Sequence, residues 1–505
     1  MTVTRNLRRR IDYRVLRWQA RLDAAWADRT IPWIGSIGLF IVLAAMSLAR
    51  ARSLETGDDM AVWVQGAWLI TTGREPNITL TGQNLFEPQL SVGFWPIAQV
   101  TRVVAPIPYL LLVQALALSL GITPVWRLCR RVCNLRVGAA GAAVVAYAAF
   151  PALHELNLTD FHPETLALPA LLWGGYHAIR GSWKWAIPLF VMALSMRSDL
   201  GFTLAAMGVA LWWSGGARGG RRLAVAGVVW TVLAQLVIQP AIGDGEFIHA
   251  VAFESYGDGP ISVLWGMLTH PLDVLSDLTS QENFVLAVAL LAPVGFIPFL
   301  APRRILPYVP VICLYFVADI PLAGVAGVQM LVPAIVGIFL ALPFGLERLG
   351  RRNIERVTVD RRLLTGLVVA SLSFFVLLSP SSPYEHPWEW GGRDGADQAR
   401  LIAIEEIDPD EDVRASPTII AELAERKVIA GVDPDAPLTG EALADDVDVV
   451  VIGPEVTEVG VRDGLYFDLG DGQSKIPVVG WRAELEDEGF ELVSEAHGVF
   501  VYRRE

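Results

Sequence analysis

Residues 31–48 read IPWIGSIGLFIVLAAMSL, and none of these eighteen side chains is charged. A helix of about this length crosses the hydrocarbon core of a bilayer. The preceding residues 1–30 are rich in arginine and hold two tryptophans, which is typical of an amphipathic segment on an anionic cytoplasmic surface. Because no clean small-residue cleavage site follows the apolar run, we expect an uncleaved first membrane span.

The composition of the whole chain fits a protein that crosses a membrane many times. Of its 505 residues, 53% are hydrophobic and 18% are charged, whereas a soluble globular chain has about 25% charged residues. This balance argues against a soluble enzyme, a disordered protein and a fibrous protein. We expect eleven spans, at residues 31–49, 107–126, 137–153, 164–179, 184–197, 199–213, 223–240, 284–301, 305–319, 328–346 and 362–379.

Charge separates the chain into two physically different parts. The net charge is −13, but residues 381–505 hold 30 acidic and 10 basic side chains, a net of −20, so residues 1–380 carry +7. So acidic a tail repels nucleic-acid phosphates, and we expect no nucleic-acid partner. We expect the tail to form a small α/β domain with helices at 397–407 and 417–426, a buried strand at 447–452 and a terminal hairpin.

Basic residues occur in alternate loops between the apolar runs. No Lys or Arg occurs in the loops at 154–163, 241–283 and 320–327. The positive-inside rule then places the N-terminus in the cytoplasm, and eleven spans place the acidic tail outside. We therefore expect a multi-pass α-helical protein of the cytoplasmic membrane. Its transmembrane domain would cover 31–380 with an outer loop at 50–106, and its extracytoplasmic domain would cover 381–505.

Two acids form the first candidate site on the predicted outer side. Asp58 and Asp59 directly precede a segment at 61–72 with apolar residues and tryptophans on one face, which predicts a helix along the membrane surface. The dipole at a helix N-terminus favours negative charge. The two carboxylates therefore either take part in chemistry or only stabilise the start of the helix.

The second candidate site is the sequence TDFHPET at 159–165. Proline suits the first helical position, so a helix is expected to begin at Pro163. In the extended stretch before it, Asp160 and His162 would point to the same side, and Glu164 would follow in the first helical turn. These groups can bind a metal, a cation or a sugar hydroxyl; the alternative is that the two acids only cap the helix.

The third candidate site lies between the short runs 184–197 and 199–213. Arg197 and Asp199 are charged at a depth where charge is costly unless it is paired or faces a polar cavity. A guanidinium can hold a phosphate through two parallel hydrogen bonds, so Arg197 is the stronger candidate. The alternative is an ion pair at an exposed hairpin tip.

These clusters resemble an uncharacterised bacterial and archaeal family of multi-pass membrane proteins, known as a domain of unknown function. That family is similar to the GT-C superfamily of glycosyltransferases, which use polyprenyl-phosphate sugars. The most specific shared segment is DFHPE, in the second cluster. The matching stretches are DMAVWVQGAWLITTG (59–73), LLVQAL (111–116), TDFHPETLALP (159–169), RSDLGF (197–202) and LTHPL (268–272).

The resemblance implies a GT-C fold with an active site at the outer face, and a first-loop acid acting as general base on the acceptor. Asp59 matches that acid, and Asp58 is its neighbour. The chain departs from the family pattern at several polar positions, where it has Val64, Gln89, Ser198 and Gly327–Gln329. These differences indicate a changed substrate or a lost activity.

Three functions follow as hypotheses. The first is an inverting glycosyltransferase that moves a sugar from a polyprenyl-phosphate carrier to an acceptor outside the membrane. Asp59 would be the base, helped by Asp58, and Arg197 would hold the donor phosphate. The second is a transporter or flippase for a lipid-linked or small solute, and the third is a non-catalytic membrane scaffold. In the first hypothesis, Asp160, His162 and Glu164 orient a substrate hydroxyl or a metal ion, so a divalent cation is a possible cofactor. Asp199 positions Arg197.

Overall fold

The computed structural model describes residues 22–242, 251–318, 328–352, 356–432, 447–454 and 481–504. Most of the basic segment 1–30 lies outside these ranges, so its amphipathic character stays a prediction. The chain divides into two compact units. The helical unit comprises Met1–Ser47, Phe86–Phe94 and Leu112–Trp388; the α/β unit comprises Leu48–Leu85, Trp95–Leu111 and Glu389–Glu505.

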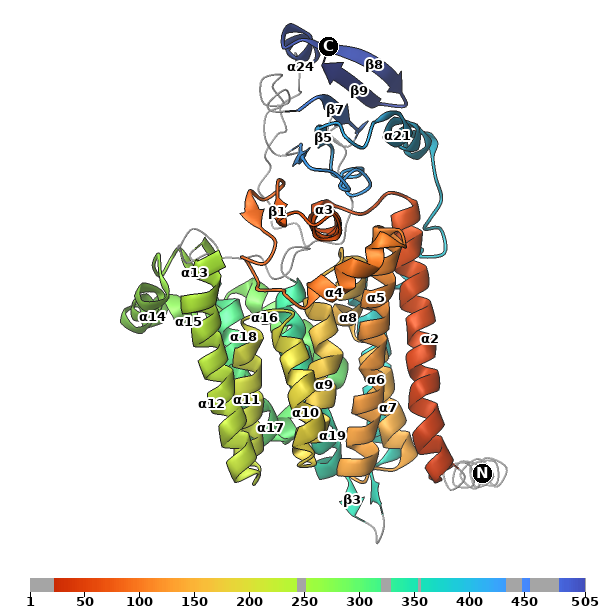
Figure 1. The fold of residues 1–505 in the computed structure, drawn as a ribbon. Coiled ribbons are helices and arrows are strands. Elements are labelled where there is room, and N and C mark those ends of the chain that lie inside the picture. The colour runs from red at the N-terminus through yellow and green to blue at the C-terminus, as the bar shows by residue number, and fades with distance from the viewer. Residues whose placement is uncertain are drawn as a thin grey trace, which may run out of the picture. The chain divides into compact units, whose positions relative to one another are not determined.

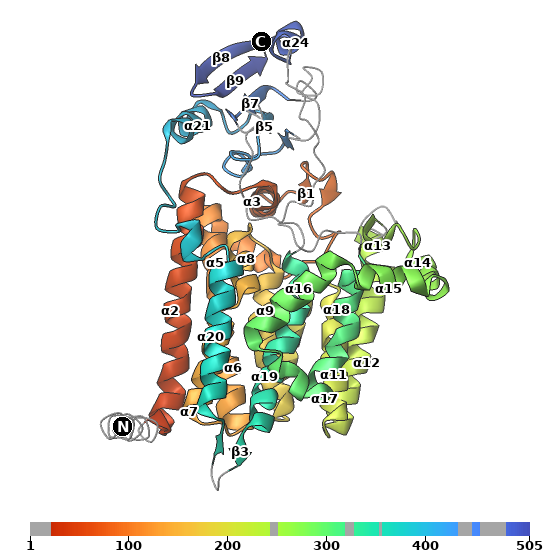
Figure 2. The same cartoon turned by 180° about the vertical axis from the view of Figure 1, so that it is seen from behind.

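Helices dominate the chain before residue 389, and Figures 1 and 2 show the long helices of the helical unit running side by side. Their bounds are α2 (Ala25–Arg52), α3 (Asp58–Thr71), α4 (Phe94–Ala98), η1 (Gln99–Arg102), α5 (Pro106–Leu120), α6 (Ile122–Arg127), η2 (Leu128–Val132), α7 (Val137–Ala148), α8 (Pro151–Leu158), α9 (Glu164–Ile179), α10 (Trp183–Leu194), α11 (Leu200–Trp213), α12 (Ala217–Leu233), η3 (Ala234–Ile238), α13 (Gln239–Ile242), η4 (Val251–Phe253), α14 (Pro260–Thr269), α15 (Pro271–Leu278), α16 (Gln281–Leu291), η5 (Ala292–Val294), η6 (Ile297–Leu300), α17 (Pro302–Ile305), η7 (Leu306–Tyr308), α18 (Val309–Phe316), η8 (Val328–Leu331), α19 (Val332–Leu349), α20 (Arg361–Leu378) and η9 (Pro383–Glu385).

Six of the described helical stretches are long and apolar enough to cross a membrane. They coincide with six of the eleven expected runs, and a bent pair at 271–294 gives a seventh. The runs at 164–179, 184–197 and 199–213 form the shorter helices α9, α10 and α11. A multi-pass membrane fold is therefore confirmed, whereas the number eleven and the orientation stay predictions. The six stretches are Ala25–Arg52, Pro106–Val132, Val137–Leu158, Arg218–Ile242, Gln329–Leu349 and Arg361–Glu385.

The buried fraction of each apolar helix distinguishes the core of the helical unit from its lipid-facing helices. The stretch containing α19 is 89% buried in its apolar window, and α19 packs against α7, α9 and α16. By contrast, the stretch containing α20 is 17% buried and that containing α12 is 22% buried, although both are equally apolar. Such extensive exposed apolar surface is stable only against hydrocarbon.

A five-stranded sheet forms the centre of the α/β unit. Its strand order is β6-β5-β7-β9-β8, parallel across β6, β5 and β7 and antiparallel from β7 to β8. All four residues of the central strand β7 are buried, as the apolar run predicts. The strands are β5 (Val413–Ala415), β6 (Ile429–Gly431), β7 (Val449–Ile452), β8 (Phe490–Ala496) and β9 (Val499–Arg504), and the helices are α21 (Gly395–Glu406) and α24 (Trp481–Asp487).

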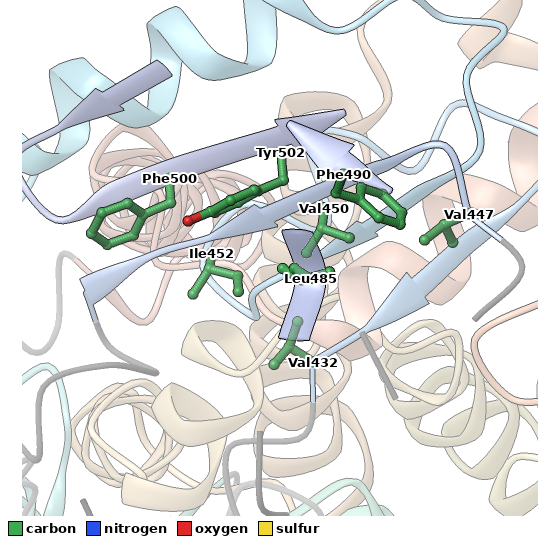
Figure 3. Packing of buried hydrophobic residues seen from close by; sticks show 8 residues of the cluster. All are labelled: Val432, Val447, Val450, Ile452, Leu485, Phe490, Phe500 and Tyr502. Atoms are coloured by element: carbon green, nitrogen blue, oxygen red, sulfur yellow. The ribbon is translucent and has the colours of Figure 1, made fainter. Parts of the chain in front are cut away.

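The predicted strand, terminal hairpin and first tail helix are confirmed. Figure 3 shows the aromatic rings of Phe490, Phe500 and Tyr502 over Val450 and Ile452, which form the core of one sheet face. Two short antiparallel pairs occur elsewhere, one in each unit. They are β1 (Asn77–Ile78) with β2 (Gln83–Asn84), and β3 (Arg351–Arg352) with β4 (Val357–Thr358).

The helix expected at 417–426 is wrong, because this segment forms successive tight turns. Its backbone hydrogen bonds span mostly three residues, for example from Glu422 to Ile419 and from Leu423 to Ile420. Buried residues occur on all sides of the segment, so no polar face remains for an amphipathic helix. The buried Arg426 guanidinium then donates to the carbonyls of Leu423 and Glu411, at 2.5 and 2.8 Å.

Candidate functional site

Arg197 lies in the turn between α10 and α11, with only 2% of its surface exposed. Its Nε donates to Asp199 Oδ1 at 2.5 Å and its Nη2 donates to Asp199 Oδ2 at 2.6 Å. Two parallel charge-assisted hydrogen bonds fix the plane of the guanidinium. The alternative of an exposed pair at a hairpin tip does not hold, because Arg197 is buried.

Two further groups complete the surroundings of the guanidinium. Nη1 donates to the carbonyl of Gln329 at 3.0 Å, and Nη2 donates to the Tyr315 hydroxyl at 3.1 Å. The same hydroxyl donates to the Asp199 carboxylate. Arg197, Asp199 and Tyr315 thus form a closed triangle of hydrogen bonds.

Glu164, the first residue of α9, joins this cluster from the second candidate site. It is fully buried, and its Oε1 lies 3.6 Å from Arg197 Nη1. Neither of its carboxylate oxygens accepts a hydrogen bond from any residue that the structure describes. If both carboxylates are ionised, one positive and two negative charges give the cluster a net charge of −1. A buried carboxylate without hydrogen-bond donors is costly, so Glu164 can accept a hydrogen bond from a ligand hydroxyl.

The DFHPE turn is held by Gln114, a buried residue of α5. The Gln114 amide nitrogen donates to the carbonyls of Leu156 and Asp160, at 2.9 and 3.2 Å, and its oxygen accepts the His162 backbone N–H at 2.9 Å. The His162 ring donates from Nδ1 to the Asp160 carbonyl at 2.8 Å. The His162 ring is therefore engaged with the backbone of its own turn, a contact that the sequence did not predict.

A small cavity of about 110 Å³ adjoins Arg197 and Asp199 in the helical unit. Its polar lining includes Gln89 and Tyr315, and the Gln89 side-chain oxygen is buried without a donor among the described residues. The apolar wall is formed by Phe202, Phe253, Leu314 and Met330. The cavity can therefore take a ligand that combines polar groups with apolar surface.

Asp58 and Asp59 form the first turn of α3 in the α/β unit, as predicted, and both are exposed. The N-cap residue is Gly57, so neither acid caps the helix through its own N-cap position. Their position relative to Arg197 stays a prediction, because the two clusters belong to different units.

Two polar side chains attach α3 to the sheet of the α/β unit. Gln65 of α3 donates to the carbonyl of Lys427 at 3.2 Å and to the Thr79 hydroxyl at 2.8 Å. The Thr79 hydroxyl donates to the Ile429 carbonyl at 2.6 Å and accepts the Ile429 N–H at 2.9 Å. The helix that carries the two acids is thereby tied to strand β6.

The sequence did not decide whether the candidate residues bind a metal ion. Within the described ranges, no group of three or more His, Cys, Asp or Glu side chains is arranged to hold a metal ion.

The sequence matches one protein family over most of its length. The family model described as "Predicted membrane protein (DUF2079)" matches residues 50–498. The chain belongs to the DUF2079 family. No curated protein sequence matches it.

The DUF2079 chain is similar to several solved structures, among them ArnT, the arabinofuranosyltransferase AftD and an oligosaccharyltransferase. ArnT from Cupriavidus metallidurans, in the apo state, is 11% identical with a TM-score of 0.54, covering 93% of this chain and 98% of that one. The arabinofuranosyltransferase AftD from Mycobacteria is 13% identical with a TM-score of 0.48, covering 94% and 40%. The Archaeoglobus fulgidus oligosaccharyltransferase is 12% identical with a TM-score of 0.38, covering 83% and 69%. The likeness to ArnT indicates that the DUF2079 chain shares its fold.

Three of the departures from the expected family pattern gather around Arg197 of the DUF2079 chain. The Ser198 N–H donates to the Gln89 carbonyl at 2.9 Å, and Gln329 supplies the carbonyl that Arg197 binds. Val64, by contrast, is buried in α3 of the α/β unit. Gly327 lies outside the described residues. The changed positions in the helical unit thus lie together around Arg197, where they would affect which ligand binds.

Proposed function

We propose that this DUF2079 protein is a membrane glycosyltransferase that moves a sugar from a polyprenyl-phosphate carrier to an acceptor outside the cytoplasmic membrane. The observation that carries the proposal is the contact of 3.6 Å between Glu164 and Arg197, which joins two of the three candidate clusters beside a cavity. Buried ionisable groups in a membrane protein are expensive and commonly mark a functional site. The GT-C-like fold agrees with this reading.

The proposed reaction is a single displacement at the anomeric carbon. The acceptor hydroxyl loses its proton to Asp59, with Asp58 assisting, and its oxygen attacks the sugar. The bond to the carrier breaks, and the polyprenyl phosphate leaves with the bonding electrons. Exposure of both carboxylates on α3 leaves them accessible to an acceptor.

Arg197 would stabilise the leaving phosphate, and its contacts define how. The bidentate pair with Asp199 holds the guanidinium in place, whereas the contact with Glu164 is long, at 3.6 Å. A donor phosphate would therefore replace Glu164 at Nη1 and leave the Asp199 pair intact. Glu164 would then turn to a sugar hydroxyl, and the turn holding Asp160 and His162 would orient it.

The scaffold hypothesis fits the cluster less well. A scaffold does not require distant polar segments to converge, yet Glu164 and Arg197 do so in a buried place. Among the described residues of the helical unit, nothing specifically favours a transporter.

Mass spectrometry of lipids that co-purify with the full-length protein tests the proposal. We expect a polyprenyl-phosphate sugar among them, and we expect Arg197→Gln to lose it. A matched control is Arg221→Gln, since Arg221 is an exposed residue of α12. A parent protein that retains only bulk phospholipid, and fails to bind added polyprenyl-phosphate sugar, would contradict the proposed donor.

A further inference from the structure

A second cluster of charged and aromatic side chains, separate from the candidate site, lies at the ends of α6 and α9. Arg127 is the last residue of α6, and its guanidinium lies over the Trp173 ring, 4.5 Å from the centroid. Arg180, which ends α9, lies over the Tyr176 ring at 5.5 Å and donates to its hydroxyl at 2.9 Å. Trp173 also stacks on His177, with ring centroids 5.8 Å apart. We call these residues, together with Arg131, the basic-aromatic cluster.

The arginines of this cluster lack acidic partners among the described residues. Neighbouring Arg130 shows the contrast, because it is buried and pairs with Asp23 at 2.7 Å and with Asp28 at 2.6 Å. No carboxylate in the described ranges lies within ion-pair distance of Arg127, Arg131 or Arg180. The Nε of Arg127 is also buried and has no hydrogen-bond acceptor among the described residues.

Like charges are held together here without neutralisation. The Arg127 guanidinium lies close enough to those of Arg131 and Arg180 for the like charges to repel one another. The faces of Trp173 and Tyr176 attract the cations but carry no net charge. An anion that accepts hydrogen bonds from several guanidinium groups would relieve both the repulsion and the unsatisfied Nε.

We propose that the basic-aromatic cluster binds the phosphate of an anionic phospholipid, in the leaflet on the basic side of the helical unit. Arg127 lies near the end of the apolar stretch Pro106–Val132, which puts the cluster at headgroup depth. Tryptophan and tyrosine favour this depth, and basic pockets between helices bind anionic headgroups there. Leu135, just beyond, bridges Val357 of β4, so the arginine-bearing β3–β4 hairpin marks the same end in Figure 1.

Exposed apolar surface beside the cluster offers a place for the acyl chains. On α10, Trp185 is 59% exposed and Ile187 is 55% exposed, and the Lys184 ammonium lies over the Trp185 ring at 5.6 Å. This inference does not depend on the proposed glycosyltransferase activity, because it concerns an ordinary membrane phospholipid and residues outside the candidate site.

Native mass spectrometry of the delipidated full-length protein tests the assignment. Dioleoyl phosphatidylglycerol and dioleoyl phosphatidylcholine are added in separate titrations, and inorganic phosphate is then added to the phosphatidylglycerol complex as a competitor. We expect phosphatidylglycerol to bind more tightly than phosphatidylcholine, and Arg131→Gln/Arg180→Gln to weaken it roughly tenfold. Both arginines are exposed, so the double variant is expected to fold; Arg127→Gln is the second variant, and Arg221→Gln/Arg222→Gln on α12 is the matched control.

Three results would overturn the proposal. Equal binding of the two lipids would remove the need for an anion. An equal loss of phosphatidylglycerol affinity in the α12 control would show that only the overall positive charge of the protein matters. Displacement of the lipid by inorganic phosphate at an equal concentration would show that a free anion, rather than a phospholipid, is the ligand.

Discussion

Thr79 and Ile429 are 350 positions apart in the sequence, yet they exchange two hydrogen bonds through the Thr79 hydroxyl. Ile429 belongs to β6, an edge strand whose free backbone groups would otherwise face outward. Thr79 occupies this edge, and Gln65 links Thr79 to α3. The tail sheet and the helix that bears Asp58 and Asp59 therefore form one structural unit.

Replacing Thr79 by valine should loosen this attachment. Thr79→Val keeps the shape but leaves the Ile429 N–H and carbonyl without their partner, at a cost of about 1–3 kcal/mol. We expect faster amide hydrogen exchange in α3, measured by mass spectrometry, with little change in α19. Thr79→Ser retains the hydroxyl and is the matched control. Unchanged protection of α3 in the valine variant would show that the hydroxyl does not hold the helix.

The ion pair at the candidate site gives a second prediction. Asp199→Asn removes the charge that compensates the buried Arg197, and loss of one partner of a buried pair costs about 3–5 kcal/mol. Thermal unfolding in detergent should show a clear loss of stability. Replacing all three charged residues, in Glu164→Gln/Arg197→Met/Asp199→Asn, leaves no buried charge uncompensated and should be less damaging than Arg197→Met alone, which strands the carboxylates of Glu164 and Asp199. A triple variant that is worse than Arg197→Met alone would mean that Glu164 or Asp199 stabilises the turn independently of Arg197.

Gln114 is expected to be essential for the DFHPE turn. Gln114→Leu leaves the carbonyls of Leu156 and Asp160 and the His162 N–H without partners in a buried place, at a cost of about 1–3 kcal/mol for each unsatisfied group. Gln114→Glu can still accept the His162 N–H but cannot donate. We therefore expect stability to fall in the order parent, glutamate, leucine, measured by thermal unfolding. Equal stability of all three would refute the role of Gln114.

Asp59 is the proposed base, and Asp59→Asn keeps its shape while removing its basicity. Incorporation of labelled sugar from a polyprenyl-phosphate donor into acceptor, in membranes that contain the protein, should fall roughly 100-fold or more. Asp410→Asn, at an exposed position of the α/β unit, is the control. Near-parental transfer by Asp59→Asn would leave Asp58 or Asp160 as the base. A variant that fails to fold would instead support a role limited to the helix start.

The pH dependence of the α/β unit can be tested at Asp412. Burial, followed by the nearby Asp448 carboxylate, raises the pKa of Asp412 above its usual value. The folded state therefore favours the protonated form. The stabilisation from protonated Asp412 is complete below the unfolded-state pKa of about 3.9. It is lost as the pH rises through the folded-state pKa. Asp412→Asn should then raise the melting temperature more at pH 7 than at pH 4. An equal effect at both pH values would contradict this.

Local patterns predicted much of the helical unit. The uncharged run at 31–48 lies within α2, and α9 begins at Glu164, one residue after the start expected at Pro163. Length was harder to predict: the apolar run at 184–197 continues beyond α10, which ends at Leu194, whereas α11 fills the run at 199–213 but has only 14 residues. Apolar composition marks such a segment as buried or lipid-facing without deciding whether it crosses the bilayer.

The candidate site was only partly predictable, because some of its polar members sit inside apolar runs. Gln114 and Tyr315 lie in the runs at 107–126 and 305–319; Gln114 falls within the matching stretch LLVQAL (111–116), but neither residue was selected as a site residue. Arg197 and Glu164 were both selected from sequence, but their contact is a tertiary event between α9 and the α10–α11 turn. A single buried polar residue in an expected span was the available signal for Gln114.

The burial of Asn157 has a practical consequence for producing the protein. Asn157 begins the sequon Asn157-Leu158-Thr159, is fully buried, and donates to the Leu43 carbonyl at 3.0 Å. Asn77 begins a second sequon and is exposed. In a glycosylating eukaryotic host, a glycan added to Asn157 during synthesis could not be enclosed by the folded bundle. Glycan occupancy at Asn157 would therefore measure the misfolded fraction of a preparation, and Asn157→Gln would not be a neutral way to remove that sequon.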